Sequence, residues 1–311
     1  MTWSTASIPD LSGTIAVVTG PTAGGIGWHT ARGLASHGAA VILAGRSWER
    51  LDAADKALHD AVPTARTEKV ALDLADLRSV RAGAEAIADA AYELGGPLRL
   101  LVNNAGVMAT PPQRTVDGLD LQLATNHFGP FLLTGLLLES LVASGSGRVV
   151  TVASLMHKMA RRAPLSYPTV PVGRYSAWGT YAQSKLANLL FTYELDRRVR
   201  AAGLPITAVA AHPGYADTHL VANGPMARWG RFSSIGQAAS SAVAQTPEAG
   251  SWPTLMAATA DLPRASYVGP GGPFELAGPP RPVSASRLAR DPDAARALWE
   301  LSEQTTGIAY P

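Results

Sequence analysis

A tyrosine and a lysine four residues apart form the first pair in this sequence that could carry out proton transfer. Tyr181 and Lys185 fall within residues 178–201, whose apolar spacing predicts a helix, and a separation of four places both side chains on one face. A phenol has an ordinary pKa of about 10, and a neighbouring ammonium stabilises the phenolate and lowers that pKa. The pair could therefore act as general acid in a reduction and as general base in an oxidation. The same spacing is also common on solvated helix faces.

Two further polar residues fall where they could join such a site. Ser154 follows a predicted buried strand, residues 148–152, at the carboxyl end of a sheet, where a hydroxyl could hold a substrate oxygen. Asn126 falls inside a predicted long helix, residues 117–142, which is an unfavourable place for asparagine, and its amide could conduct protons through water. The alternatives are a serine that caps a turn and an asparagine that faces solvent or bends the helix.

The elements that must position these residues alternate between strand and helix. Apolar runs predict strands at residues 15–19, 41–44, 68–72, 98–102, 148–152, 206–210 and 266–268, and helical spacing predicts helices at 28–37, 49–61, 79–94, 117–142, 178–201, 235–245, 247–260 and 292–305. Strands that are apolar all round and alternate with helices predict an α/β fold, a single Rossmann-like, doubly wound parallel sheet with helices on both faces. Since no linker separates a second domain, residues 1–311 are expected to form one domain with a C-terminal extension that covers the substrate.

A glycine-rich turn, residues 20–27 (GPTAGGIG), joins the first predicted strand to the first predicted helix. Glycines there let backbone N–H groups approach a pyrophosphate, and the helix N-terminus supplies positive potential. Arg46 follows the second strand, where this fold places the residue that reads the adenosine ribose. An arginine offers a fork of donors suited to a 2′-phosphate, which favours NADP over NAD. The alternative is an exposed arginine at the start of a helix.

Composition narrows the classes of function further. A formal charge of +2 and the absence of a dense run of Lys and Arg with aromatics argue against a nucleic-acid partner. With no cysteine in the chain, disulfides, thiolate zinc sites and cysteine nucleophiles are excluded, and no His/Asp/Glu cluster has metal spacing, so no metal is expected. The most apolar window, residues 128–142, is too short to span a bilayer, and residues 1–12 do not read as a signal peptide. A cytoplasmic protein is the expectation.

Taken in order along the chain, these residues resemble the short-chain dehydrogenase/reductases, Rossmann-fold enzymes with a Tyr-x-x-x-Lys site. The resemblance covers about residues 12–268 and is carried by Thr19-Gly20, Gly25-Ile26-Gly27, Asp73-Leu74, residues 103–106 (NNAG), Asn126, Ser154, residues 181–185 (YAQSK) and Pro213-Gly214. A narrower likeness is to the retinol dehydrogenase, protochlorophyllide reductase and WW-domain oxidoreductase branch. It is carried by Arg46, residues 126–129 (NHFG), residues 181–191 (YAQSKLANLLF) and the long insert between Ser154 and Tyr181.

The resemblance implies an NADP(H)-dependent oxidoreductase that moves a hydride between the nicotinamide and a carbonyl or alcohol. It implies that Tyr181 is the acid/base and that Lys185 lowers its pKa and holds the nicotinamide ribose. Ser154 would orient the substrate oxygen, and Asn126 would hold a water of the proton relay. The cofactor-binding residues would be Gly20, Thr22, Gly24, Gly25, Ile26, Gly27, Arg46, Asp73, Leu74, Asn103, Ala105, Gly106, Tyr181, Lys185, Pro213, Gly214 and Thr218.

The sequence departs from the family pattern at two places. Four residues, 21–24, separate Thr19-Gly20 from the next glycine motif, where the family usually has three, so either Gly24 or Gly25 could meet the phosphate. Ala153 stands where a second serine often precedes the reactive one, and no effect is expected because Ser154 aligns with the reacting position.

Substrate choice and assembly stay open at this stage. Residues 156–179 and 219–234 could form a lid over a small-molecule substrate or be surface loops. His157 is expected to pack or form hydrogen bonds rather than to catalyse, and His212 could hold its loop. A lyase, epimerase or C=C reductase on the same fold, or a silent nucleotide-binding protein, are the alternative functions. A homodimer or homotetramer through the two long helices and a monomer are both open.

Overall fold

The strands form one twisted sheet at the centre of the molecule. The computed structural model describes residues 3–163, 168–169, 174–215 and 245–311. Within them, the eight strands lie in the order β3-β2-β1-β4-β5-β6-β7-β8. The strands are β1 (Ile15–Thr19), β2 (Ala40–Gly45), β3 (Arg66–Ala71), β4 (Leu100–Asn103), β5 (Gly147–Val152), β6 (Ile206–Ala211), β7 (Tyr267–Pro270) and β8 (Pro280–Pro282). All neighbouring pairs from β3 to β7 are parallel, so the predicted Rossmann-like α/β fold is confirmed.

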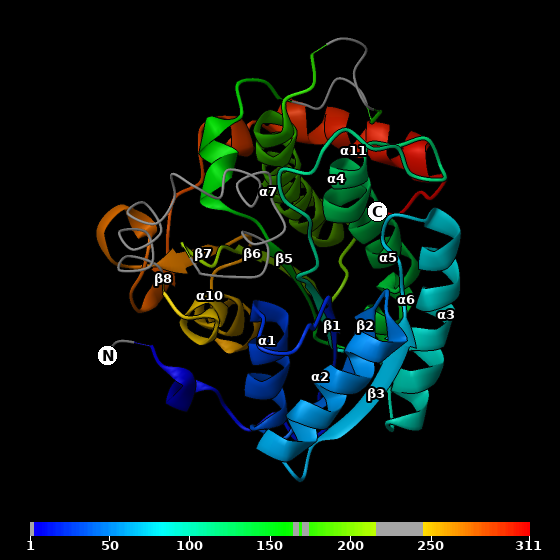
Figure 1. The fold of residues 1–311 in the computed structure, drawn as a ribbon, viewed down its shortest axis with the longest axis vertical. Coiled ribbons are helices and arrows are strands. Elements are labelled where there is room, and N and C mark those ends of the chain that lie inside the picture. The colour runs from blue at the N-terminus through cyan, green and yellow to red at the C-terminus, as the bar shows by residue number, and fades with distance from the viewer. Residues whose placement is uncertain (1–2, 164–167, 170–173, 216–244) are drawn as a thin grey trace, which may run out of the picture.

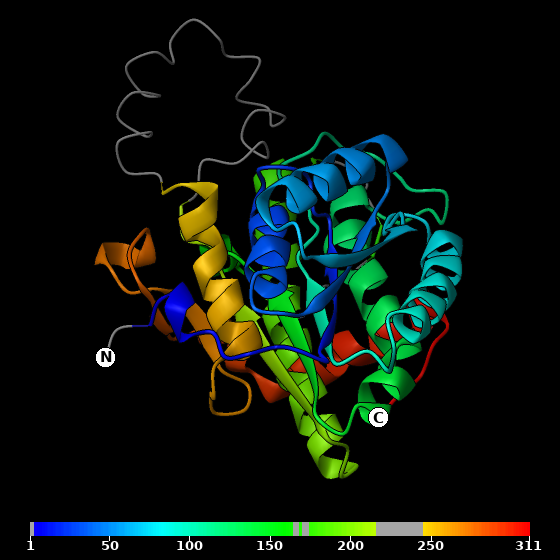
Figure 2. The same ribbon diagram turned by 90° about the horizontal axis from the view of Figure 1, so that it is seen from below.

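Helices cover both faces of this sheet (Figure 1). They are α1 (Ile26–Ala35), α2 (Trp48–Ala61), α3 (Leu77–Glu93), α4 (Leu121–Leu123), α5 (Gly129–Leu136), α6 (Leu138–Ala143), α7 (Ala177–Ala201), α10 (Pro247–Thr259) and α11 (Pro292–Thr306). Short turns of 3-10 helix are η1 (Thr5–Ser7), η3 (Leu155–Met159), η5 (Pro273–Glu275) and η6 (Leu288–Arg290). One face carries α1, α2 and α10, and Figure 2 shows α10 beside α1.

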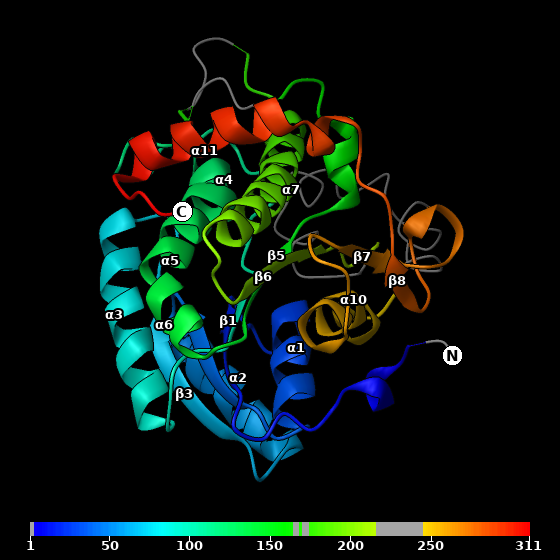
Figure 3. The ribbon, with the colours of Figure 1, turned by 180° about the vertical axis from the view of Figure 1, so that it is seen from behind.

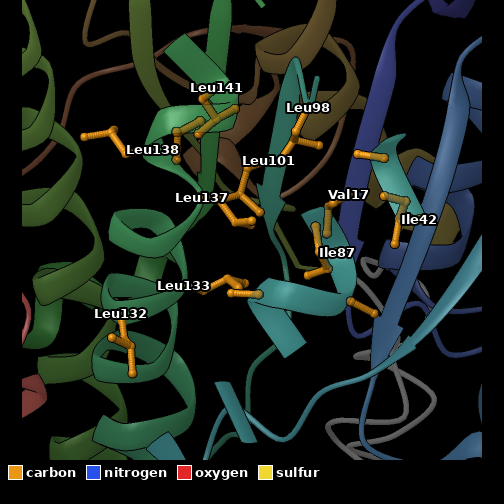
Figure 4. Packing of buried hydrophobic residues seen from close by; sticks show 14 of the residues in the cluster. Val17, Ile42, Ile87, Leu98, Leu101, Leu132, Leu133, Leu137, Leu138 and Leu141 are labelled. Atoms are coloured by element: carbon orange, nitrogen blue, oxygen red, sulfur yellow. The ribbon is translucent and has the colours of Figure 1, made fainter. Parts of the chain in front are cut away.

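The apolar residues divide into cores on the two sides of the sheet. Because β1 is buried throughout, alternate residues point to opposite sides: Val17 joins the core under α3 and α5, and Val18 joins the core under α1 and α10. Figure 4 shows Val17 and Ile42 of the sheet with Leu133 of α5 and Ile87 of α3 in the first of these cores. Burial of both faces of the parallel strands is the main source of stability for such a sheet.

The C-terminal helix lies across α7 on the far side of the molecule (Figure 3). Trp299 of α11 stacks on Phe191 of α7 with ring centroids 5.9 Å apart, and it meets Phe131 of α5 edge-on at 5.0 Å. Tyr310 closes the group at 4.7 Å from Trp299. Aromatic packing of this kind makes the C-terminal segment part of the core.

The single helix predicted over residues 117–142 is wrong. Helix α4 begins at Leu121 because the Asp120 carboxylate accepts the N–H groups of Gln122 and Leu123 and so caps it. A π-helical turn, η2 (Ala124–Phe128), then follows, and a non-helical Leu137 separates α5 from α6. The π-helical turn contains Asn126, whose side chain bonds to Val107 rather than to the helix.

The strand β8 was not predicted from the sequence, which shows only a Pro/Gly-rich stretch there. It pairs antiparallel with β7, with Gly269 opposite Arg281, and two of its three residues are prolines. An edge strand tolerates proline because one side of it needs no ladder hydrogen bonds. The sheet is therefore parallel with one antiparallel edge strand. The helix predicted at residues 235–245 lies outside the described residues except at Gln245.

Among the residues that the structure describes, none of the helices combines the length and the apolar character needed to cross a membrane.

Candidate active site

Helix α7 places the predicted acid/base pair against the end of β5. The Ser176 hydroxyl accepts the N–H of Gly179 and caps the helix, and the two side chains of the pair follow within its first turns. Tyr181 and Lys185 are both buried, with 6% and 4% of their surface exposed. The Lys185 ammonium donates to the Val152 carbonyl at 2.9 Å and lies 5.8 Å from the centre of the Tyr181 ring. The pair therefore shares one helix face, as the spacing predicted.

Ser154 meets this pair from the carboxyl end of β5. Two residues past the strand, its backbone is extended, and its hydroxyl oxygen accepts the N–H of Met156 at 3.2 Å to start η3. The turn-capping role is therefore observed, and the role of Ser154 toward a substrate oxygen stays a prediction. The polar Ser154 hydroxyl near Tyr181 lowers the pKa of the phenol.

Burial dominates the electrostatics of the pair. It raises the pKa of Tyr181 to about 12, and the nearby Ser154 hydroxyl opposes that rise. Burial also lowers the pKa of Lys185 to about 8. The phenol therefore keeps its proton near neutral pH, which is the form that a general acid needs. The lowering of the Tyr181 pKa by Lys185 stays a prediction.

Asn126 lies in the π-helical turn, a deformation that often marks functional positions. Its amide donates to the Val107 carbonyl and to the Ser184 hydroxyl, both at 2.9 Å, and its oxygen accepts the Val107 N–H at 2.8 Å. A Cβ added at Gly106 would lie 3.2 Å from the Asn126 oxygen and 3.5 Å from the Lys185 ammonium nitrogen. Asn126 and Lys185 thus converge on the end of β4, where glycine leaves room.

The glycine-rich loop leads from β1 into α1. Gly20 and Gly24 have φ of 68° and 73°, the left-handed region that glycine adopts most readily. Gly25 is the N-cap of α1, and its N–H donates to the carbonyl of Thr22 at 2.8 Å. Gly27 is required by packing, since a Cβ there would lie 2.4 Å from the Asn104 amide nitrogen. Helix α1 therefore begins at Ile26, directly after the glycine-rich loop, so its N-terminal N–H groups and their positive potential lie at this loop.

The neighbouring turn after β4 is tied to the same loop. The Thr19 hydroxyl accepts the N–H groups of Asn104 and Ala105, both at 3.0 Å. The Asn104 amide donates to the Thr19 carbonyl at 2.8 Å. Asn103 instead donates to Thr134 of α5 at 3.1 Å, and its oxygen is buried without a hydrogen-bond partner among the described residues. Asn104 rather than Asn103 is therefore the amide that fixes the glycine-rich loop.

The other predicted cofactor residues lie along the same edge of the sheet. Arg46 is exposed directly after β2, and Asp73 follows β3, where its carboxylate accepts the N–H of Ala75 at 2.9 Å beside a buried Leu74. Pro213 and Gly214 follow β6, and Gly214 has a φ of 68°. Thr218 and the predicted lid segment 219–234 lie outside the described residues.

This edge fits a dinucleotide. The strand order reverses at β1, which lies between β2 and β4, and open α/β sheets bind ligands at such a switch point. A Cβ at Gly20 would come within 3.0 Å of Ala105, so the backbone there has no room for a side chain. The N-terminus of α1 could hold the pyrophosphate, and Lys185 and Tyr181 lie at the far end of the same edge.

The buried Gln122 is a residue that sequence reasoning missed. Its side-chain oxygen accepts the N–H of Ala109 at 2.8 Å, and its nitrogen donates to the Tyr175 hydroxyl at 2.7 Å and to the Ala177 carbonyl at 3.1 Å. It thus joins the loop after β4 to the start of α7. Its one signal in the sequence is a glutamine among the apolar residues of a predicted helix.

Part of the predicted lid, residues 156–179, lines a surface cavity of about 620 Å³ beside α7. Arg161, Arg162 and Arg174 contribute to its wall together with Met159 and Trp178. Neither Tyr181 nor Lys185 lines this cavity, and its link to the pair is Trp178, whose ring meets the Tyr181 ring edge-on at 6.3 Å.

Comparison with known proteins identifies the family. Residues 14–228 match the family model for short chain dehydrogenases. The chain is 39% identical over 225 residues to retinol dehydrogenase 11 of Homo sapiens, which covers 72% of this chain and 67% of that protein. It is 38% identical over 310 residues to polyprenol dehydrogenase of Mus musculus, which covers 96% and 86%.

Solved structures agree with this assignment. An uncharacterized protein from Mycobacterium paratuberculosis superposes with a TM-score of 0.81 at 40% identity, covering 100% of both chains. A protein described as an NAD(P)-dependent gluconate 5-dehydrogenase, from Beutenbergia cavernae and with bound NADP, superposes with a TM-score of 0.60 at 29% identity over 80% of this chain and 91% of that one. The chain therefore belongs to the short-chain dehydrogenase/reductase family of oxidoreductases, in its retinol dehydrogenase branch.

Proposed function

We propose that this protein is an NADP(H)-dependent oxidoreductase that interconverts a carbonyl compound and its alcohol. The observation that carries the proposal is the convergence of Tyr181, Lys185 and Asn126 beside Ser154 at one sheet edge. That edge also carries the glycine-rich loop and the N-terminus of α1. General acid, oxygen-binding hydroxyl and cofactor loop are therefore in one place.

We assign each of the four polar residues a separate role in the reaction. NADPH bound along the edge would supply the hydride. Ser154 donates a hydrogen bond to the substrate oxygen and orients it, and Tyr181 gives that oxygen a proton, or takes one in the reverse direction. Lys185 holds the nicotinamide ribose and favours the phenolate once Tyr181 has lost its proton. Asn126 holds a water through which that proton is replaced from solvent.

The cofactor preference rests on Arg46. It lies exposed at the carboxyl end of β2, where its guanidinium can pair with a 2′-phosphate, and no acidic residue takes that position. The relative from Beutenbergia cavernae that holds NADP supports the same choice. We assign the cofactor contacts to the residues named from the sequence, with Asn104 as the amide that shapes the loop and with NAD as the weaker ligand.

We propose that the whole chain, residues 1–311, acts as one domain on a small-molecule carbonyl or alcohol. The lid predicted from the sequence comprises segment 156–179, which the structure describes in part, and segment 219–234, which lies outside the described residues. Met159 and Trp178 are exposed by 63% and 37% at the cavity beside α7, whose wall also carries Arg161, Arg162 and Arg174, which favours a substrate with an apolar body and a polar end. The names of the relatives, retinol dehydrogenase and polyprenol dehydrogenase, point in the same direction.

The chain is proposed to act as a monomer. Helix α7 is one of the two helices through which the family commonly pairs, and α11 of the same chain already packs against it through Trp299. Arg198 of α7 also lies over the Trp299 ring at 4.6 Å. Light scattering after size exclusion should give the chain mass of 32.3 kDa. A mass of twice that value would contradict the proposal.

A titration tests the function directly. Fluorescence binding of NADPH and NADH is followed in the same cuvette by oxidation with a panel of long-chain and short-chain aldehydes and ketones. The proposal expects tighter binding of NADPH and turnover of a carbonyl compound. Binding without turnover by any member of the panel would shift the assignment to a C=C reductase, an epimerase or a silent nucleotide-binding protein.

A further inference from the structure

A fully buried histidine joins the Ser154 turn to a distant part of the chain. His157 lies in η3, three residues past Ser154, and none of its surface is exposed. Its Nδ1 lies 2.7 Å from the carbonyl oxygen of Ser154. Its Nε2 accepts the N–H of Ser286 at 3.1 Å, across 129 residues of sequence, from the segment between β8 and η6. One imidazole therefore bridges the turn and the C-terminal segment.

The two partners fix the state of this ring. A backbone carbonyl only accepts and a backbone N–H only donates, so Nδ1 must carry the hydrogen and Nε2 must be bare. Burial lowers the pKa of His157, and the positive charge of Lys158 lowers it further, against the opposing effects of the Ser154 carbonyl and Glu275. A second proton would place two N–H groups face to face at Ser286. The neutral ring satisfies both bonds.

A second contact runs beside the first. Lys158 pairs with Glu275 at 3.0 Å, and the same carboxylate lies 3.4 Å from the ring of His212, which precedes Pro213-Gly214. Glu275 and Phe274 have φ of 59° and 53°, so two consecutive residues with side chains hold the left-handed region. Such backbone persists only where surrounding contacts impose it. The β7–β8 connection thus touches the loops after both β5 and β6.

Packing leaves little freedom in this contact. A Cβ at Gly214 would lie 2.3 Å from the carbonyl oxygen of Leu276, and a Cβ at Gly269 would lie 1.9 Å from the His212 ring. Tyr267 of β7 lies between the two histidines, with ring centroids 5.7 Å from His157 and 5.1 Å from His212. Strand β7 and the β7–β8 connection therefore pack closely against the two histidines that follow β5 and β6.

We propose that His157 is a positioning residue, which holds Ser154 beside Tyr181 by bonding the Ser154 turn to the C-terminal segment at Ser286. The inference rests on the proposed function for its kinetic consequence. His157 touches the backbone of Ser154 and not the reacting atoms, so it acts through the direction of the Ser154 hydroxyl. A misplacement of about 1 Å in a catalytic group can cost roughly a hundredfold in rate.

The test compares three variants in the full chain. His157→Phe keeps the ring volume and loses both hydrogen bonds, and His157→Gln keeps an acceptor for the Ser286 N–H. His59→Phe, a histidine on α2 far from this site, is the control. The expected result is a fall in kcat of roughly tenfold to a hundredfold for His157→Phe, with a smaller fall for His157→Gln and unchanged NADPH affinity. The control should match the wild type.

A pH profile separates positioning from general loosening of the fold. Because the nearby Ser154 hydroxyl lowers the pKa of Tyr181, displacement of Ser154 should move the Tyr181-dependent limb of alcohol oxidation to higher pH in His157→Phe. If His157→Phe does not fold, the same shift is expected in smaller size in His157→Gln. An unchanged profile with an unchanged kcat in a folded variant would overturn the proposal.

A readout without turnover keeps this inference distinct from the proposed function. Amide hydrogen exchange at Ser286 and Met156 should speed up in His157→Phe and stay as in the wild type in His59→Phe. Faster exchange in a protein that turns over none of the carbonyl panel would support the bridge while the proposed function fails. Unchanged exchange at both amides would overturn the bridge, whatever the activity.

Discussion

The nucleotide half of the sheet and the C-terminal part beyond β6 build their share of the site by different means. Around β1 and β4 glycine backbone and short local hydrogen bonds shape the site: Gly20 and Gly24 take left-handed conformations, and Gly27 leaves room for the Asn104 amide that bonds to Thr19. The part beyond β6 is joined to the site by contacts between residues far apart in the sequence, from the Ser286 N–H to His157 and from Glu275 to Lys158. Backbone contacts suit a constant ligand, and side-chain contacts can vary with the substrate.

The matches to known proteins also distinguish the nucleotide half from the C-terminal part. The family model ends at residue 228, within the chain's third quarter, whereas the match to polyprenol dehydrogenase covers 96% of the chain. The C-terminal part is thus shared with relatives of this branch beyond the general family pattern. We infer that the nucleotide half makes most of the cofactor contacts and that the C-terminal part adjusts the reacting end.

Loss of the phenol at the junction of the two regions should give the largest effect. Tyr181→Phe should reduce kcat by roughly a hundredfold to ten-thousandfold, the usual contribution of a general acid, and leave the Kd for NADPH nearly unchanged. Tyr193→Phe is the matched control, since it removes a phenol from the same helix. Steady-state kinetics and a fluorescence titration measure both. A Tyr181→Phe protein with normal turnover would remove Tyr181 from the mechanism.

The nucleotide half is tested next through its charge. Arg46→Asp should weaken NADPH relative to NADH by roughly tenfold to a hundredfold, because a charge-assisted bond contributes about 1.5–3 kcal/mol. Arg50→Asp, one turn into α2, removes an equal charge away from the end of β2 and should change the preference little. An unchanged preference in Arg46→Asp would mean that the 2′-phosphate is read elsewhere.

Because this half depends on glycines that leave no room for a side chain, adding one methyl group at Gly27 should destabilise the protein. Gly27→Ala places a Cβ within 2.4 Å of the Asn104 amide and should lower the free energy of unfolding by about 1–3 kcal/mol, with weaker NADPH binding. Gly96→Ala is the control, because the nearest atom to its added Cβ is 4.0 Å away. Urea unfolding of both variants decides the matter. Equal stabilities would show that the loop does not need glycine at position 27.

The C-terminal part should respond to acid. His127 bonds to Ser302 of α11 at 2.8 Å, and burial lowers its pKa to about 3. Since the unfolded state takes up this proton near pH 6.5 and the folded state does not, stability is full above pH 6.5 and is lost as the pH falls toward 3. The slope is about 1.4 kcal/mol per pH unit for one proton.

A substitution isolates this contribution. His127→Gln should flatten the dependence of unfolding free energy on pH by about one proton, while the slope from His212, whose pKa burial also lowers to about 3, remains. Urea unfolding between pH 7 and pH 5 measures the slope. A variant with the same slope as the wild type would show that His127 does not titrate on unfolding.

Much of the nucleotide half could be predicted because its signals are local. The buried strand β1, the glycine-rich turn and the start of α1 follow one another along the chain, and strand periodicity placed β1 at its observed bounds. The Tyr181 and Lys185 pair was found for the same reason, since four residues on a helix fix a shared face. The order of the strands then brought Ser154 to the same edge.

The other features could not be predicted, because they depend on contacts between residues that are far apart in the sequence. The π-helical turn at Asn126 arises from bonds to Val107, a partner 19 residues away, and periodicity predicts an unbroken helix there. Strand β8 is rich in proline, and only pairing with β7 makes it a strand. The bridge from His157 to Ser286 spans 129 residues, so the sequence could predict a packing or hydrogen-bonded histidine at that position but not its distant partner.

Transfer of deuterium from the cofactor tests the central claim most directly. The protein is incubated with NADPH that carries deuterium at the transferable position of nicotinamide C4, together with an apolar aldehyde, and the alcohol is analysed by mass spectrometry. The account predicts deuterium on the carbinol carbon with the wild type and only a trace with Tyr181→Phe. Alcohol formed without deuterium, or equal transfer by Tyr181→Phe, would contradict it.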